Sequence, residues 1–190
     1  MMTELENYIQ NYFGVNKEEV TKISSYFKLL HLKKGEFFLK SGRYSDHLGF
    51  MQSGIMREFL NTNNKEVTKW ISTKGYFSVD LASFIFKQPA RWNIQALTDC
   101  ELYVINQKDY QLIGQELSSW AVLEKLFLTK CFIILEERIV QHLSMSAEER
   151  YNQLFNFNPE LFNQVSLQYL ASMLGITPET LSRIRKNQLL

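Results

Sequence analysis

Residues 165–186 read Val-Ser-Leu-Gln-Tyr-Leu-Ala-Ser-Met-Leu-Gly-Ile-Thr-Pro-Glu-Thr-Leu-Ser-Arg-Ile-Arg-Lys, which predicts two short helices joined at a glycine. Ser166 stands where it can cap the first helix, and Gly175 stands where a left-handed residue can end it. Thr177 can cap the second helix, with Pro178 at its first position, where a missing N–H costs nothing. Two short helices that meet at a glycine form the helix-turn-helix pattern.

The apolar residues of this run predict a small shared core. Ala171 is small and lies four residues before the glycine, so the two helices can approach each other. The other apolar positions that close this core are Leu170, Leu174, Ile176, Leu181 and Ile184. An ordinary helical hairpin needs only that apolar spacing, and it gains little from an exposed polar face on the second helix. We therefore favour a DNA-reading motif over a plain hairpin.

The polar residues of the two helices suit the phosphate backbone and the base edges of a DNA duplex. Hydroxyls and free N–H groups at a helix N-terminus suit phosphate oxygens, and we predict phosphate contacts at Ser166, Gln168 and Thr177. Glu179 can accept a hydrogen bond from a cytosine amine, and Arg183 can reach O6 and N7 of guanine in the major groove. The predicted DNA-binding surface also includes Thr180, Ser182 and Lys186.

Composition describes an ordinary folded chain. Of its 190 residues, 45% are hydrophobic and 22% are charged, and the formal net charge is +1. This predicts one medium domain and one small domain rather than a disordered tail. Net charge argues neither for nor against nucleic acid, but basic residues gather near the C-terminus, at Arg183, Arg185 and Lys186. Basic charge focused in this way suits phosphate contact.

The cysteines and the N-terminal residues predict the cellular compartment of the protein. Cys100 and Cys131 are too few for a disulfide framework, a zinc site or a cluster held by four thiolates. Buried free thiols suit a reducing cytoplasm. The first residues are acidic where a secretory signal is basic, and no apolar run approaches membrane-spanning length. We expect a cytoplasmic protein with no metal site and no membrane partner.

Residues 3–30 have the spacing of one or two helices, and from about residue 29 the apolar period changes to two. Short apolar pieces are divided by turn signals, including Gly35, Gly42, Gly54 and Gly75. Many short strands at near-regular spacing indicate a closed or double-sheet β structure. The alternation lapses over residues 77–86, which predicts a short helix that could serve as a lid or ligand floor.

After Asp109 the pattern is helical again and apolar over much of the helix circumference. One face of this helix can cover the β structure, and the other needs a partner helix. A two-fold dimer is the commonest solution, so we predict a homodimer. The predicted interface consists of Leu123, Phe127, Cys131 and Ile134.

The predicted fold class is α+β. Residues 1–112 are expected to form a double-stranded β-helix of the jelly-roll kind with a helical lead-in. Residues 113–143 are expected to form the dimerisation helix, and residues 144–190 an all-α helix-turn-helix domain.

This arrangement resembles the family of the cAMP receptor protein and FNR, and it looks most like the compact Bacteroidetes-type members. The resemblance covers nearly the whole chain and is carried by Gly75-Tyr76-Phe77, by Cys100-Glu101-Leu102 and by residues 179–183. It implies a cyclic-nucleotide-binding-type sensor domain and a homodimeric, non-enzymatic transcription regulator that binds double-stranded DNA at a palindromic site. The recognition helix would lie around residues 177–188, with bases read by Glu179, Ser182 and Arg183. RNA polymerase is a further expected partner.

The predicted effector pocket departs from this family. Members that bind cyclic nucleotides open the short helix with Gly-Glu-Leu and hold the phosphate with an Arg-Ser pair, whereas this chain has Val79, Asp80 and Leu81, then Arg91 before Trp92. Val79 replaces a glycine whose backbone must approach the ligand closely. Arg91 is displaced by one position, which turns a strand side chain to the opposite face. We expect no cAMP binding of the family's kind, no identified cofactor, and either an empty pocket or an unknown small-molecule effector.

Two alternatives stay open. A cupin-like β-roll enzyme needs a metal held by two or three histidines and a carboxylate, and the β region offers only His31 and His47. A binding module could use the helix-turn-helix to grip protein rather than DNA, although this leaves the exposed pair Glu179 and Arg183 unexplained.

Overall fold

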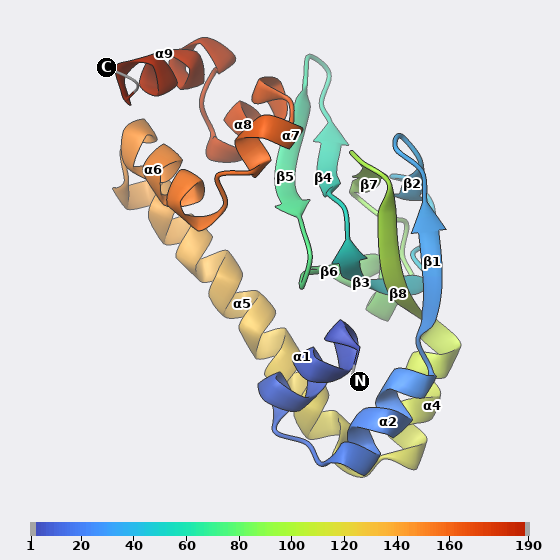
Figure 1. The fold of residues 1–190 in the computed structure, drawn as a ribbon. Helices are drawn as coiled ribbons and strands as arrows, with labels where there is room; N and C mark the ends of the chain where they lie inside the picture. Colours follow the sequence, from blue (N-terminus) through green and yellow to red (C-terminus); the bar gives the residue numbers. More distant parts are fainter. Residues whose placement is uncertain (1–2, 189–190) are drawn as a thin grey trace. The chain divides into compact units, whose positions relative to one another are not determined.

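A computed structural model describes residues 3–188, which form two compact units (Figure 1). The first unit runs through residue 60 and includes residues 71–127. The second unit contains residues 61–70 and the chain from residue 128 onward. Strands and helices are both present, which confirms the predicted α+β class.

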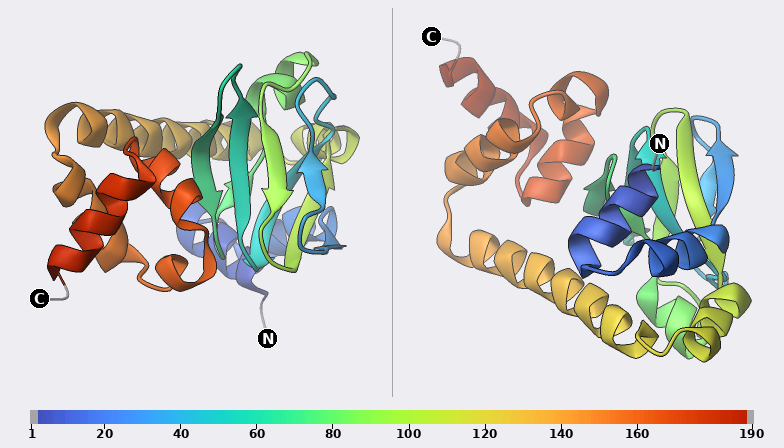
Figure 2. Two further views of the ribbon diagram at one scale, coloured as in Figure 1. Left: turned by 90° about the horizontal axis from the view of Figure 1, so that it is seen from above. Right: turned by 60° about the horizontal axis from the view of Figure 1, so that its bottom comes forward.

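Capping residues determine where the first two helices begin. α1 (Glu4–Phe13) follows Thr3 and α2 (Lys17–Ser25) follows Asn16, and each cap residue forms a capping box with the glutamate three residues later. Gly14 ends α1 in the left-handed region, with φ 64°. The two helices pack against each other, and Figure 2 shows them beside the strands, which confirms the predicted helical lead-in.

Antiparallel strands build two four-stranded sheets, which confirms the predicted double-sheet β-roll. The strand orders are β1-β8-β3-β6 and β2-β7-β4-β5, so strands far apart in the sequence become neighbours. The four predicted turn glycines all have φ between 80° and 91°. The strands are β1 (Lys28–Leu32), β2 (Phe37–Leu39), β3 (His47–Ser53), β4 (Met56–Asn61), β5 (Glu66–Ser72), β6 (Phe77–Ser78), β7 (Asn93–Ala96) and β8 (Cys100–Asn106).

The interior of the β-roll is filled by apolar side chains that point inward from both sheets. Met51, Ile94 and Leu102 are fully buried there. Cys100 lies in the same cluster, and burial raises the pKa of its thiol above the ordinary value. The prediction of a buried free thiol is confirmed for Cys100, whereas Cys131 is only half-buried.

The predicted interruption of the strands is the short helix α3 (Leu81–Phe86). The helical pattern after the strands divides into α4 (Gln107–Glu116) and α5 (Trp120–Ser144), so the long helix begins at Trp120 rather than at residue 113. Leu117 is extended, and the chain turns so that the ring of Trp120 packs edge-on against Tyr110 of α4, with ring centroids 5.1 Å apart. This tertiary contact explains why a continuous apolar pattern contains a break.

The helices of the second unit follow α5 directly. They are α6 (Ala147–Phe157), α7 (Leu161–Gln164), α8 (Leu167–Leu174) and α9 (Pro178–Gln188). Ser146 and Glu149 form a capping box at the start of α6. Within residues 3–188, every helix is too short or too polar to cross a membrane.

Candidate nucleic-acid interface

α8 and α9 meet at the predicted glycine. Gly175 has φ 70° and ψ 31°, and the N–H of Ile176 donates to the carbonyl oxygen of Ala171 at 3.0 Å, which closes the end of α8. Ala171 is fully buried between the two helices, as its size predicts. The predicted helix-turn-helix geometry is therefore confirmed in the backbone.

Two arginines from preceding helices hold this turn, and the sequence did not predict their role. Arg138 of α5 donates through Nη2 to the carbonyl oxygen of Met173 at 2.7 Å. Arg150 of α6 donates through Nε to the carbonyl oxygen of Leu174 at 3.0 Å. The last carbonyls of a helix lack partners within it, so guanidinium groups there satisfy them and interact favourably with the helix dipole. The arginines thus fix the end of α8 to α5 and α6.

α9 has one buried face and one exposed face. Leu181 and Ile184 are buried in the core of the second unit. The Oγ1 atom of Thr177 accepts from the backbone N–H of Thr180 at 3.2 Å, so Thr177 caps α9 as predicted. The exposed face carries a shallow groove lined by Pro178, Glu179, Ser182, Arg183 and Lys186. Four of the predicted DNA-binding residues are therefore brought together on one open surface.

The carboxylate of Glu179 can accept a hydrogen bond from DNA. Hydrogen bonds from its own backbone N–H and from the Thr177 hydroxyl hold the pKa of Glu179 below the ordinary glutamate value. An ionised carboxylate can accept a hydrogen bond from the exocyclic amine of cytosine.

The predicted phosphate contacts lie at the starts of the two helices. Ser166 precedes α8 and is exposed, but its hydroxyl does not make the predicted cap hydrogen bond. Gln168 and Thr177 are exposed as well, whereas Thr180 is half-buried with its hydroxyl 3.2 Å from that of Thr177. Ser166 therefore has a hydroxyl available for an external acceptor, and Thr180 is the least accessible residue of the predicted set.

The hairpin of residues 61–70 packs on α8 within the second unit. The hydroxyl of Ser172 accepts from the backbone N–H of Thr68 at 2.9 Å and lies 3.5 Å from the carbonyl oxygen of Glu66. The guanidinium of Arg138 lies over the ring of Trp70, 5.2 Å from its centroid. Sequence spacing cannot reveal these contacts, because they join residues about 70 to 100 positions apart.

The predicted effector residues are arranged around α3. Asp80 is buried and caps this helix by accepting from the N–H of Ser83 at 3.0 Å. Its second carboxylate oxygen accepts from the N–H groups of Arg91, at 2.9 Å, and Trp92. Val79 and Leu81 are half-buried, and the side chain of Arg91 is exposed. The Asp80 carboxylate therefore accepts hydrogen bonds from the backbone around α3.

Two of the predicted dimer residues on α5 are buried within their own chain instead of exposed for a partner. Leu123 and Phe127 are buried in the core of the first unit, with 4% and 8% of their surfaces exposed, and Cys131 and Ile134 are half-buried. We remove Leu123 and Phe127 from the predicted interface, because they already have apolar partners in their own chain, whereas Cys131 and Ile134 stay predictions. A broad apolar surface lies elsewhere on the helix, and its members are Val122, Leu126, Leu128, Phe132, Ile133, Leu135, Ile139, Val140 and Leu143.

Comparisons with known proteins agree with this architecture. The family model described as "Cyclic nucleotide-binding domain" matches residues 29–115. No sequence among the curated proteins matches the chain. Among solved structures, the c-di-GMP-responsive global regulator CLP of Xanthomonas campestris is similar, with a TM-score of 0.70, 16% identity and coverage of 92% of each chain.

Two further solved structures resemble the chain over most of its length. The catabolite activator protein of Thermus thermophilus has a TM-score of 0.59 and 23% identity, and the match covers 93% of this chain and 84% of that one. FixK2 of Bradyrhizobium japonicum has a TM-score of 0.66 and 15% identity, with coverage of 85% and 83%. The cyclic nucleotide-binding domain model thus matches residues 29–115, and the chain as a whole shares its fold with these three solved structures.

Proposed function

We propose that the protein is a homodimeric transcription regulator that binds a palindromic DNA site through α9. The observation that carries this proposal is the two-faced character of α9. Its inner residues Leu181 and Ile184 are buried, while Glu179, Ser182, Arg183 and Lys186 line an open groove. A helix with a buried apolar face and exposed hydrogen-bonding groups is the form that enters the major groove.

Each of the four exposed side chains that line the groove of α9 has a proposed role. Glu179 accepts from cytosine, Arg183 donates to guanine, and Ser182 contacts a neighbouring base. Lys186 completes the surface with a second positive charge. Ser166, Gln168 and Thr177 contact phosphate oxygens and set the register of the helix on the duplex.

The apolar surface of α5 supports the proposed dimer. Phe132, Ile139 and Leu143 are 66%, 60% and 83% exposed, so large apolar side chains meet water when the chain is alone. They lie on one side of the helix because they are seven and four residues apart. Contiguous apolar surface of this kind marks an association site, and a second copy of α5 would cover it symmetrically. RNA polymerase as a partner and a cytoplasmic location stay predictions.

The response to salt tests the DNA-binding proposal against a protein-binding role. Neutralising phosphates with Lys and Arg releases counterions, so affinity for DNA falls steeply as salt rises. Arg183 and Lys186 place two positive charges per chain at the duplex, or about four per dimer, so we expect a loss on the order of 100-fold between about 50 and 200 mM salt. Fluorescence anisotropy of a labelled duplex measures this, and an affinity for DNA that does not change with salt would contradict the proposal.

We also propose that cAMP is not the effector. Asp80 already accepts three backbone N–H groups, and the side chain of Arg91 is exposed. A ligand at 100 times its dissociation constant stabilises a protein by about 2.7 kcal/mol, which raises Tm by several degrees. We expect a Tm shift below about 1 °C at about 1 mM cAMP in calorimetry, and a shift of several degrees would contradict this expectation.

The metal-enzyme alternative gains no support from the described residues. Among residues 3–188, no three His, Cys, Asp or Glu side chains come together as a group that could hold a metal ion.

A further inference from the structure

Three large apolar side chains of the first unit are exposed at and beside α3. They belong to Tyr44, Ile85 and Phe86, which have 63%, 41% and 75% of their surfaces exposed. Outside α5, Leu29 is the one other large apolar residue that is exposed in the described part of this unit. The exposed apolar surface of the β-roll is therefore gathered mainly at α3.

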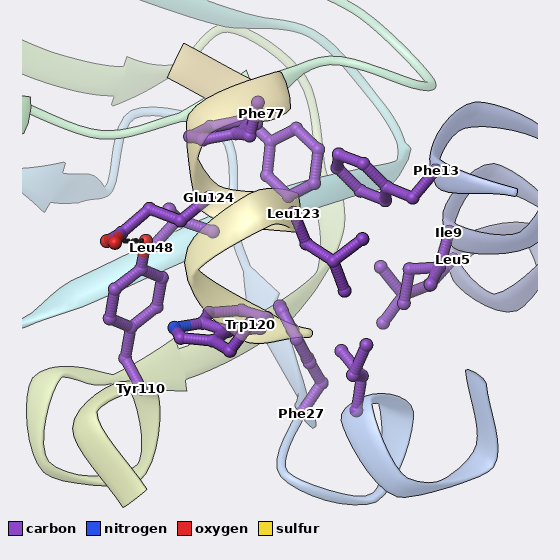
Figure 3. Close-up of a pocket in the computed structure, with 12 residues that line it drawn as sticks. Leu5, Ile9, Phe13, Phe27, Leu48, Phe77, Tyr110, Trp120, Leu123 and Glu124 are labelled. Carbon is purple, nitrogen blue, oxygen red and sulfur yellow. Dashed lines mark hydrogen bonds between the residues drawn. The ribbon is translucent and has the colours of Figure 1, made fainter. Parts of the chain in front are cut away.

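The helical side of the same unit is closed by its own chain. Leu5 and Ile9 of α1 point toward Leu123 of α5 (Figure 3), and all three side chains are buried. The space enclosed among them and their neighbours measures only about 50 Å³. Packing within the chain thus covers the apolar side chains there, whereas it leaves those at α3 in contact with water.

Backbone hydrogen bonds hold Tyr44 beside α3. The N–H of Ser45 donates to Oγ of Ser83 at 2.7 Å. The N–H of Ala90 donates to the carbonyl oxygen of Arg43, also at 2.7 Å. Tyr44 lies between these two anchored residues, so the loop is fixed against the short helix. A surface that is already ordered loses less conformational entropy when a partner binds.

Basic charge surrounds the apolar side chains at α3. The basic residues here are exposed, and they are Lys40, Arg43, Lys87 and Arg91. Residues 40–45 and 81–92 contain no Asp or Glu, so their local charge is +4, against +1 for the whole chain. The nearest acids in the sequence are Asp46, whose carboxylate contacts His47, and Asp80, which is buried. The surface therefore has a clear excess of positive charge.

The basic groups of this surface are available to an outside acid. Within residues 3–188, Arg43, Lys87 and Arg91 take part in no ion pair. Lys87 directly follows Phe86 and is the one described non-glycine residue with a positive φ, 52°. Glycine adopts that conformation more easily, but lysine adds a charge there. An anionic group would meet three cations without breaking an existing pair.

We propose that this surface binds a short protein segment that carries both acidic and apolar side chains. Carboxylates of the segment match the excess of basic charge, and its apolar side chains cover Ile85 and Phe86. Tyr, Phe and Arg are residue types that are enriched at protein interfaces. The backbone of a DNA duplex would pair with the basic residues, but it would leave Ile85 and Phe86 against charged phosphates.

The extent of the surface sets the strength of the contact. An aromatic side chain buries about 150–250 Å², so two aromatic residues and one isoleucine stay below the roughly 800 Å² per partner of a stable interface. A contact of this size is transient. We expect a dissociation constant of roughly 10–100 µM for a segment that fits it.

Selection from random peptides displayed on phage tests the surface on the full-length protein. The wild-type protein is the bait, and the double variant Lys87→Glu/Arg91→Glu is used to remove peptides that bind elsewhere. The surviving peptides should have a net negative charge and contain aromatic or aliphatic residues. Recovery of no related peptides, or of peptides without an excess of acid, would overturn the proposal.

Matched variants locate the binding of one synthetic peptide from this selection, measured by fluorescence anisotropy. Phe86→Ser should weaken binding about tenfold or more, and it is independent of the charges used in the selection. Arg91→Glu should weaken binding to a similar degree and reduce its dependence on salt. The corresponding changes on the exposed strand β1, Leu29→Ser and Lys28→Glu, should leave affinity within about twofold.

Normal peptide binding by folded Phe86→Ser would contradict the proposed surface. Phe86 is 75% exposed, so this variant keeps the core of the β-roll. If Arg91→Glu does not fold, Lys87→Glu supplies the same charge reversal, and unchanged affinity in that variant would contradict the role of the basic residues.

Two further probes separate a protein segment from other anionic partners. One is a vesicle of equal parts phosphatidylglycerol and phosphatidylcholine, and the other is a single-stranded oligonucleotide. Wild-type protein and Phe86→Ser should bind each probe equally weakly. Loss of vesicle or oligonucleotide binding in Phe86→Ser, without peptide binding by the wild type, would assign the surface to a lipid or a nucleic acid and overturn the proposal. Peptide binding depends on residues of the first unit alone, so a failure of DNA binding leaves this result intact.

Discussion

Replacing Arg183 by alanine is expected to weaken binding to the preferred operator by about 1–3 kcal/mol, or about 5- to 150-fold. The guanidinium can donate two hydrogen bonds to O6 and N7 of one guanine, and alanine makes neither. Preference at that one base pair should relax, because the contact discriminates guanine from the other bases. Competition binding with operators altered at single positions measures both effects.

Two further variants show whether Arg183 acts on a base. Lys186→Ala removes the same charge from the same groove, and if Lys186 contacts phosphate, its loss should weaken all sequences to a similar degree. Arg91→Ala removes an exposed arginine from the first unit and should leave DNA binding unchanged. A uniform loss in Arg183→Ala would mean that Arg183 touches only phosphate.

Replacing Phe132 by glutamate is expected to raise the dissociation constant of the dimer at least about 100-fold, or about 3 kcal/mol. Phe132 is 66% exposed on α5, so the substitution leaves the core of each chain intact. In a dimer it would bury a charge without a partner, which is strongly unfavourable. Operator affinity should fall as well, because two linked recognition helices bind far more tightly than one. Sedimentation equilibrium measures the first effect.

Gln141→Glu is the matched control for Phe132→Glu. Gln141 lies nine residues after Phe132 on α5, which places it on the opposite side of the helix. Gln141→Glu therefore introduces the same negative charge away from the proposed interface. The dimer should persist in this variant. Unchanged sedimentation of Phe132→Glu would contradict the proposed interface.

Local signals were sufficient to predict the helix-turn-helix. A capping hydroxyl, a proline at the first helical position and a glycine at the turn act within a few residues, and the structure confirms Thr177, Pro178 and Gly175 in those places. The double-sheet β-roll was also predictable, because glycine turns divide short strands of period two. Grouping of the exposed residues of α9 follows from helical spacing alone.

Features that depend on tertiary contact were not predictable from spacing. An apolar stripe on α5 indicates that a face is buried, but it does not tell whether the partner is the same chain or a second copy. Leu123 and Phe127 therefore looked like dimer residues, although they pack inside the first unit. The hydrogen bonds from Arg138 and Arg150 to α8 join residues 24 to 35 positions apart, for which the sequence carries no local signal.

Selection of bound sequences from random duplexes tests the central proposal most directly. Two recognition helices related by a two-fold axis should enrich an inverted repeat, with half-site centres one helical turn apart, or about 10 base pairs. The wild-type protein should enrich this repeat, and Phe132→Glu should enrich it much less. Recovery of no common sequence, or of a single site without an inverted partner, would contradict a dimer that presents two copies of α9 to DNA.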